Sequence, residues 1–320
     1  MRHFSSMRFM TGFKTELLAL TLALTSSAIA QSSPLSINPP AINPPSISVT
    51  DDNQRIVTLA QPAQRIVSLA PSLTELLYAA GAGAQVVGVS EYSDFPPEAK
   101  TLPVVGRYDL LDMETIVALA PDLIVAWRTG NPRSAVQSLI DLGFNVYVAE
   151  PTTIASIADH IERFATLAGT QAIGLATAEH FREELAQLDN TYRNREPVRV
   201  FYQVWNEPLI SVGGNELIND IIRLCGGNNI FGDLGLAPKV SEEAVLLRDP
   251  AVIIVSGMDA SRPAWLDDWL RWPQMQAVAN GHLYFVPPDL VQRHSLRVLS
   301  GTEQTCQHIE AARHSPVNNR

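Results

Sequence analysis

The sequence predicts an α/β protein with two lobes, each built on a central parallel sheet, that one long rigid α-helix joins. Residues 170–196 contain no proline and carry apolar residues at steps of three or four, as one face of a helix requires. On both sides of this helix, short apolar runs alternate with helical patterns, which is typical of parallel sheets covered by helices. A helix–turn–strand unit also occurs once before and once after it, at 113–127 and 241–257.

The long helix is predicted from its start and from its apolar face. The hydroxyl of Thr170 is suited to cap the first turn, where an exposed N–H needs an acceptor. At about 1.5 Å per residue, about 24 residues would form a rod of roughly 36 Å. The apolar face consists of Leu175, Ala178, Phe181, Leu185, Leu188 and Tyr192.

The first thirty residues have the order of a secretory signal peptide: a basic start, an apolar run at 17–24 and the small residues Ala28-Ile29-Ala30. We therefore expect cleavage after Ala30 and a periplasmic protein. The apolar run is too short to anchor the chain in a bilayer, and no later run is long enough to span one. Residues 31–47, rich in proline and serine, should form an extended leader.

The first lobe is predicted at 48–169. It should begin with a hairpin around the turn-forming residues 51–53. Strands are then expected at 65–71, 85–90, 122–127 and 144–150, and helices at 72–80, in the second part of 104–119, at 132–142 and at 154–168.

The second lobe is predicted at 197–313, before a short tail at 314–320. Its strands are expected at 198–205, 208–214 and 282–288, and its helices at 216–227, 264–280 and 296–312, with the repeated helix–strand unit at 241–257 between them.

Charge and cysteine content restrict the possible partners and the chemistry of the two cysteines. Residues 1–30 carry three positive charges and one negative charge, so the net charge of −10 becomes −12 after cleavage. Such an acidic protein does not suit nucleic acid or anionic lipid. Cys225 and Cys306, both in the second lobe, predict a disulfide in an oxidising compartment, with a metal site as the alternative.

Signatures of catalysis are missing from the sequence. It contains no G-x-S-x-G, H-E-x-x-H, phosphate loop or C-x-x-C, and its seven histidines show no metal-ligand spacing. We therefore expect a protein that is not an enzyme and holds no cofactor or metal. An enzyme acting on an envelope substrate is the alternative from another class.

Aromatic residues mark the predicted binding site. Trp127 and Trp205 each end a strand, one in each lobe, and Tyr92 and Tyr108 lie on loops that follow strands. Ligands of open α/β sheets bind beyond the carboxyl ends of strands. Facing lobes would bring these rings to one cleft that suits a large flat ligand. The alternative for Trp127 is a place in the core, where we also expect Trp269 and Trp272.

Glu114 and Glu243 occupy equivalent places in the repeated unit, each at the start of a helix. A carboxylate is favourable there because of the helix dipole, which is the simpler explanation. Two equivalent carboxylates would also form a two-point docking surface for a partner with matching arginines.

Several blocks resemble the periplasmic cobalamin-binding proteins of bacterial ABC importers, and the similarity covers residues 60–312. These blocks are EYSDFPPEA (91–99), METIVALAPDLIVAWRTGN (113–131), LCGGNNIF (224–231), VSEEAVL (240–246) and PPDLVQR (287–293). The resemblance implies the class III periplasmic binding protein fold, whose members also bind siderophores, haem and metal ions. One family tryptophan is replaced here by Ala237.

By this resemblance, Tyr92, Tyr108 and Trp127 contact the corrinoid from the first lobe. Trp205 and the segment Asp289, Leu290, Val291, Gln292 and Arg293 contact it from the second, with Arg293 reaching amide or phosphate oxygens. Glu114 and Glu243 bind arginines of the membrane permease, and Cys225 pairs with Cys306. The expected function is capture of cobalamin or a related corrinoid, carried as cargo, and its delivery to an ABC permease. The alternative is a siderophore-binding or haem-binding protein of such an importer.

Overall fold

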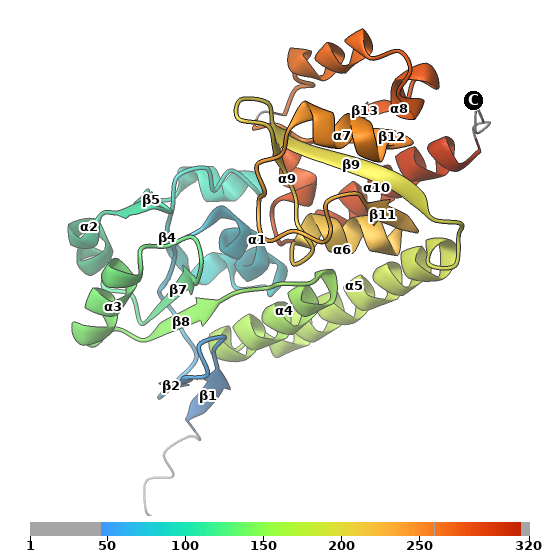
Figure 1. Ribbon diagram of the computed structural model, residues 1–320. Coiled ribbons are helices and arrows are strands. Elements are labelled where there is room, and N and C mark those ends of the chain that lie inside the picture. Colours follow the sequence, from blue (N-terminus) through green and yellow to red (C-terminus); the bar gives the residue numbers. More distant parts are fainter. Residues whose placement is uncertain (1–45, 259, 315–320) are drawn as a thin grey trace, which may run out of the picture. The chain divides into compact units, whose positions relative to one another are not determined.

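The first lobe is built on a four-stranded parallel sheet (Figure 1). The computed structural model describes residues 46–258 and 260–314. The strand order is β4-β3-β7-β8, with β3 at Ile66–Ser68, β4 at Val86–Val89, β7 at Leu123–Trp127 and β8 at Val146–Ala149. Three of these strands consist almost entirely of buried residues, as a sheet covered on both faces requires.

Helices and two short hairpins complete this lobe. The helices are α1 (Pro71–Ala79), α2 (Met113–Ala118), α3 (Arg133–Asp141) and α4 (Ile154–Ala168), with 3₁₀ turns at Gly83–Gln85 and Pro97–Thr101. The hairpins are β1 (Ile47–Thr50) with β2 (Ile56–Leu59), and β5 (Gly106–Arg107) with β6 (Leu110–Leu111). The predicted strands and helices are confirmed, whereas the β5–β6 hairpin was predicted as a loop.

The second sheet repeats this arrangement. Its parallel strands are β11 (Gly227–Asn229), β9 (Val198–Trp205), β12 (Val252–Val255) and β13 (Leu283–Phe285), and β10 (Ile210–Ser211) pairs antiparallel with β9. The helices are α6 (Leu217–Leu224), α7 (Glu242–Arg248), α8 (Gln276–Ala279), α9 (Pro288–Val291) and α10 (Val298–Arg313), with a 3₁₀ segment at Ala264–Arg271. The prediction did not include β11 or α9.

The repeated unit occupies the same place in both sheets. In the first sheet β3 lies between β4 and β7, and in the second β9 lies between β11 and β12. The pairs α2–β7 and α7–β12 therefore correspond, as the sequence repeat predicted. Both α2 and α7 begin with a capping side chain: Asp112 accepts from the N–H of Thr115, and Ser241 accepts from the N–H of Ala244.

The long helix α5 spans Gln171–Tyr192, so it is shorter than predicted and ends in a turn after Tyr192. Two details of the prediction were wrong. The Thr170 hydroxyl does not cap the helix, because it donates to the carbonyl of Ala80 at 2.6 Å. Leu175 is exposed, and the buried residue beside it is Gly174. A Cβ on Gly174 would lie 2.2 Å from that of Ala165, so this glycine allows α5 to pack closely along α4.

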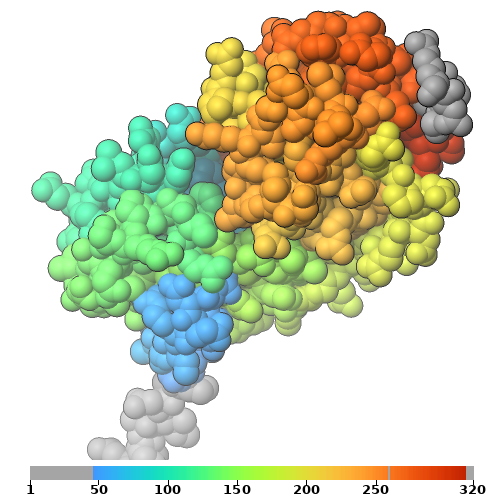
Figure 2. Space-filling model, viewed as in Figure 1, coloured from blue at the N-terminus to red at the C-terminus, as the bar shows by residue number. Residues whose placement is uncertain are grey.

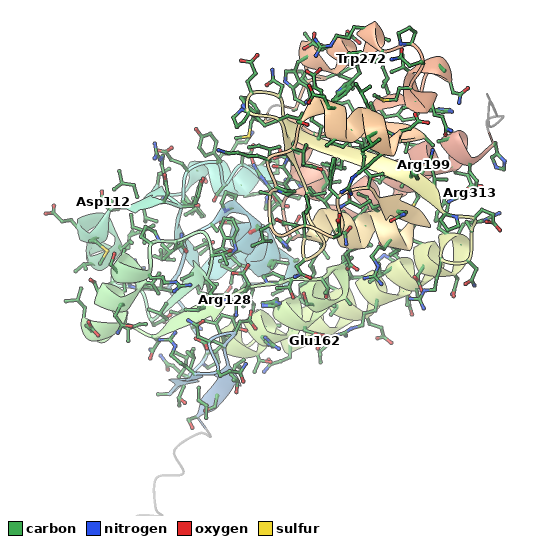
Figure 3. The ribbon with its side chains drawn as sticks, in the orientation of Figure 1. Asp112, Arg128, Glu162, Arg199, Trp272 and Arg313 are labelled. Atoms are coloured by element: carbon green, nitrogen blue, oxygen red, sulfur yellow. A yellow bond between two sulfur atoms is a disulfide. The ribbon has the colours of Figure 1, made fainter. Side chains whose placement is uncertain are left out.

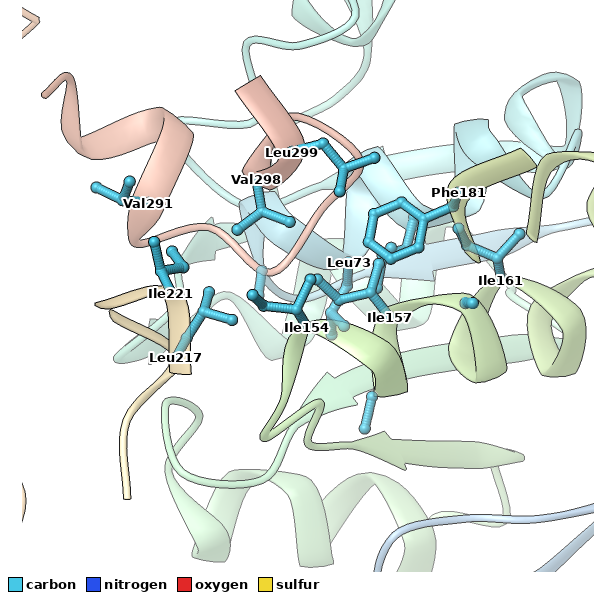
Figure 4. Packing of buried hydrophobic residues seen from close by; sticks show 14 of the residues in the cluster. Leu73, Ile154, Ile157, Ile161, Phe181, Leu217, Ile221, Val291, Val298 and Leu299 are labelled. Atoms are coloured by element: carbon cyan, nitrogen blue, oxygen red, sulfur yellow. The ribbon is translucent and has the colours of Figure 1, made fainter. Parts of the chain in front are cut away.

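One hydrophobic core extends through both lobes. Leu73 of α1, Ile157 and Ile161 of α4, and Phe181 of α5 belong to the same buried cluster as residues of α6, α9 and α10. Figure 4 shows the last group, Leu217, Ile221, Val291, Val298 and Leu299, packed near the first. The space-filling view likewise shows the blue-to-green lobe in direct contact with the orange-to-red lobe (Figure 2). A shared close-packed core resists gradual deformation, which favours small movements between the lobes.

A disulfide joins α6 to α10 in the second lobe. Cys225 and Cys306 are bonded, which confirms the predicted pair and leaves neither thiol for a metal. The predicted signal peptide, the leader up to residue 45 and residues 315–320 of the tail lie outside the described residues. Within residues 46–258 and 260–314, no helix combines the length and the apolar character needed to cross a bilayer.

Candidate functional site

Three exposed or half-exposed aromatic rings follow strands of the first lobe. Tyr92 lies on the loop after β4 and is 70% exposed. Tyr108, between β5 and β6, is 42% exposed. Its ring centre lies 6.0 Å from that of Trp127, the last residue of β7, with the ring planes at 49°. The indole of Trp127 is half-buried and packs against the core at its inner edge.

The buried residue Asn131 holds Trp127 and Tyr108 together. Its side-chain oxygen accepts from the Trp127 N–H at 2.6 Å, and its amide nitrogen donates to the carbonyls of Leu69 at 2.9 Å and Tyr108 at 2.7 Å. Gly130 is required for the same geometry, because a Cβ there would lie 1.8 Å from the Trp127 ring. A cavity of about 370 Å³ borders Trp127 and Asn131 on the side of α3.

The predicted segment 289–293 lies on α9 and in the turn after it, at the carboxyl end of β13. Asp289 and Leu290 are half-buried, and the side-chain amide of Gln292 donates to Ser256 Oγ at 2.7 Å. Val291 is different, because it is fully buried in the shared core and so supports the segment from behind. Trp205, at the end of β9, is 37% exposed, and its indole N–H donates to the carbonyl of Glu207 at 2.9 Å.

Arg293 connects the second lobe to the tyrosine loop of the first lobe. Its Nη1 donates to Asp94 Oδ1 at 2.7 Å and to Glu75 Oε1 at 3.1 Å, and its Nε lies 3.0 Å from Asp289 Oδ1. Asp94 stands two residues after Tyr92. Burial alone would raise the pKa of Asp94, but the hydrogen bond and positive charge of Arg293 hold it below its ordinary value. Arg293 thus joins the segment 289–293 to the loop that carries Tyr92.

Three arginines near the aromatic loops have carboxylate partners, whereas Arg133, which borders the cavity beside Trp127, forms no ion pair with the described residues. Arg107 forms a pair with Asp109 at 2.7 Å, and Arg128 lies 3.6 Å from Glu150 (Figure 3 labels Arg128). Arg293 is paired with the three carboxylates Glu75, Asp94 and Asp289. The part of the chain that the structure describes also has no group of three His, Cys, Asp or Glu side chains placed for a metal ion. The exposed aromatic faces therefore suit a ligand with large flat surfaces.

Glu114 and Glu243 are both exposed and sit at the same helical position, two residues after the capping residue of α2 or α7. Figure 3 labels the first capping residue, Asp112. Hydrogen bonds from its own backbone N–H and from Ser241 lower the pKa of Glu243, which keeps it ionised. The two carboxylates are therefore available to a partner with positive charge.

Four residues that contribute to this geometry were not predicted: Glu75, Asp94, Asn131 and Arg297, whose guanidinium donates to Glu75 Oε1 at 2.6 Å. Asp94 and Asn131 lie inside the blocks 91–99 and 113–131 that carry the family resemblance, close to the aromatic residues that were chosen. Glu75 and Arg297 gave no signal, because a charged residue in a helix is normally exposed. Only tertiary packing shows that Glu75 is buried.

Comparison with known proteins identifies the family of this chain. The family described as "Periplasmic binding protein" matches residues 66–290. The "Vitamin B12-binding protein" of Vibrio cholerae is 38% identical over 253 residues, which cover 78% of this chain and 91% of that protein. The crystal structure titled as the periplasmic vitamin B12 binding protein BtuF of Vibrio cholerae is 37% identical, with a TM-score of 0.74 over 79% of this chain and 99% of that chain.

More distant structures share the fold alone. A periplasmic heme-binding protein, RhuT from Roseiflexus sp. RS-1, is 23% identical, with a TM-score of 0.68 over 78% of this chain and 99% of that chain. At this identity the likeness carries no information about the ligand.

Proposed function

Because this chain belongs to the periplasmic binding protein family, we propose that it captures cobalamin or a related corrinoid and delivers it to the transmembrane permease of an ABC importer. In this role it acts in the periplasm after cleavage at Ala30, carries the corrinoid as cargo and catalyses no reaction. The two lobes, 48–169 and 197–313, hold the ligand between them, and the helix α5 joins them.

The observation that supports this function best is the composition of the site. Tyr92, Tyr108 and Trp127 offer aromatic faces from the first lobe. Asp94, on the loop of Tyr92, accepts a hydrogen bond from Arg293, which follows α9. A corrin ring is large and flat, and its edge carries neutral amide groups. Aromatic contact area supplies affinity for such a ring, and the carboxylates Asp94 and Asp289 can accept amide N–H groups.

Pairing of the nearby arginines favours a corrinoid over an anionic ligand such as haem. Arg107, Arg128 and Arg293 are paired with carboxylates, so an anion at these groups would compete with an existing ion pair. Arg133, beside Trp127, is the arginine that an anion could bind without such competition. The 38% identity to a vitamin B12-binding protein also favours a corrinoid.

Titration calorimetry with cyanocobalamin tests the ligand. We expect one binding event per chain at about 10–100 μM ligand or below, together with a rise in melting temperature. Haemin under the same conditions should give a much weaker response. Heat with haemin and none with cyanocobalamin would reverse the assignment.

The docking role of Glu114 and Glu243 is tested separately. We expect the double variant Glu114→Ala/Glu243→Ala to bind cyanocobalamin as the wild type does but to lose uptake in cells. Glu179 and Glu183 on α5 are exposed too, so Glu179→Ala/Glu183→Ala is a control with the same change in charge. If uptake survives in the docking variant, the two glutamates only stabilise the starts of their helices.

A further inference from the structure

Glu75 is a buried carboxylate that binds two guanidinium groups from the other lobe. It lies on α1, and only 3% of its side chain is exposed. Its Oε1 accepts from Arg297 Nη2 at 2.6 Å and from Arg293 Nη1 at 3.1 Å, and its Oε2 accepts from Arg297 Nε at 2.9 Å. Arg293, just after α9, lies 218 residues further along the chain, and Arg297, just before α10, lies 222 residues further along.

The two arginines also bind the loop after β4. Arg293 pairs with Asp94 of that loop, and the guanidinium of Arg297 lies over the ring of Phe95 at 4.5 Å. Arg293 in addition pairs with Asp289, one helical turn before it. Two positive groups thus meet three carboxylates, and the contacts join α1 and the tyrosine loop of the first lobe to α9 and α10 of the second.

The position of Glu75 makes these contacts interdependent. A buried carboxylate is strongly unfavourable unless it is paired, and removing one partner of a buried pair leaves the other uncompensated. The pairs lie beside the shared core, where Leu73 of α1 packs in one cluster with Val298 and Leu299, the residues that follow Arg297 (Figure 4). The ionic contacts and the apolar contacts at this junction should therefore form and break together.

We propose that Glu75, Arg293 and Arg297 form an interlobe clamp, in which Glu75 is the positioning residue that fixes the distance between the tyrosine loop and α9. The clamp keeps Arg293 paired, so that Asp94 and Asp289 are the charged groups that face a ligand. This second consequence rests on the proposed function, whereas the clamp itself does not.

Hydrogen exchange of the ligand-free protein tests the clamp. In Glu75→Gln we expect amides of 71–79 and 288–298 to exchange faster by a factor of about ten or more, because removing one partner of a buried pair favours local opening. The control is Glu162→Gln, which removes one of the two carboxylate partners of Arg182 on the surface of α4 and α5 (Figure 3 labels Glu162). It should leave both segments unchanged.

A second variant keeps the test decisive if Glu75→Gln does not fold. Asp94 is half-exposed, so Asp94→Asn should fold and still loosen Arg293. We expect faster exchange at 288–298 in this variant, and weaker cyanocobalamin binding by a smaller factor than in Glu75→Gln. Unchanged exchange in both variants would overturn the clamp. Faster exchange without any cyanocobalamin binding by the wild type would leave the clamp intact and reject the proposed ligand.

Discussion

The two lobes have equivalent sheets but differ in how each is held together and in what each offers a ligand. In the first lobe, polar contacts of Asp52 with His160 and Arg163 attach the β1–β2 hairpin to α4. In the second lobe, the disulfide Cys225–Cys306 attaches α6 to α10. The first lobe presents three aromatic rings at its strand ends, whereas the second presents Trp205 and the polar segment on α9.

The equivalence of the two lobes extends to the exposed glutamates but not to the residues proposed to bind the ligand. The exposed glutamates stand at equivalent positions in both lobes, so a partner with twofold-related arginines can contact both in the same way. The residues proposed to bind the ligand have no such equivalence. We therefore propose a symmetric docking surface and an asymmetric binding site, in which the first lobe carries most of the affinity.

Loss of the disulfide should have the largest effect, and it should be greatest in the second lobe. It closes a loop of 81 residues, and in the chain-entropy model Cys225→Ser/Cys306→Ser should lose about 4 kcal/mol of unfolding free energy. Chemical denaturation measures the loss, and hydrogen exchange locates it. Reductant should not destabilise the double variant further. Equal destabilisation of both lobes would mean that they unfold as one unit.

Acid should weaken the junction between the lobes through His294, in the turn between α9 and α10. Burial, with a smaller contribution from His160, lowers the pKa of His294 to about 4. The unfolded chain takes up a proton near its ordinary pKa of 6.5, and the folded chain does so only near 4. Stability should therefore fall as the pH drops from 6.5 to 4, by about 2–3 kcal/mol.

Melting temperatures between pH 4 and 7.5 measure this effect. In His294→Gln the dependence over that window should be smaller than in the wild type. The exposed residue His180 provides the control, since His180→Gln should keep the full dependence. A pH dependence that is the same in all three proteins would show that His294 does not report on the junction.

The asymmetry of the site predicts unequal effects of its two tryptophans. Trp127 is fixed by Asn131 and lies near Tyr108, so Trp127→Ala should weaken cyanocobalamin binding about tenfold or more. Trp205 is held by one hydrogen bond within its own loop, and Trp205→Ala should cost less. Calorimetry on both variants measures the difference, with circular dichroism to verify folding. A larger loss for Trp205→Ala would contradict the asymmetric site.

The polar contacts of the first lobe should give the smallest effect. Burial would raise the pKa of Asp52, but hydrogen bonds from His160, Glu150 N–H and Arg163 outweigh it and lower the pKa to about 2. Ionised Asp52 thus stabilises the fold above pH 4, and this contribution is lost as the pH falls toward 2. After allowance for solvent screening, Asp52→Asn should cost about 1 kcal/mol at pH 7.

Denaturation at pH 7 and at pH 2.5 measures this contribution. The difference between wild type and Asp52→Asn should shrink at the lower pH. A difference that stays constant would assign the effect to packing of the hairpin and not to the charge of Asp52.

Much of the fold could be predicted because its signals are local. Apolar runs located β7, β9 and β12, and the pattern at 154–168 gave α4 with its ends. The boundaries of α5 were less accurate, because exposed residues such as Leu175 fit a helical face without being buried. Short elements such as α9 and β11 carry too few residues for a periodic pattern.

The site was predictable only in part, for a similar reason. Exposed aromatic residues after strands are visible in a sequence, so Tyr92, Tyr108 and Trp127 could be chosen. Whether Arg293 is free or paired depends on Glu75 and Asp94, which are about 200 residues away along the chain. Likewise, the burial of Val291 follows from the packing of α9 on the shared core and from no pattern within 289–293.

The most direct test of the proposed carrier role is to pass the protein through a gel-filtration column after incubation with cyanocobalamin. The corrinoid absorbs visible light, so its amount in the protein peak can be read from the spectrum. We predict about one equivalent of corrinoid per chain in that peak, and much less for Trp127→Ala. If all of the corrinoid elutes with the small molecules, the protein is not a corrinoid carrier.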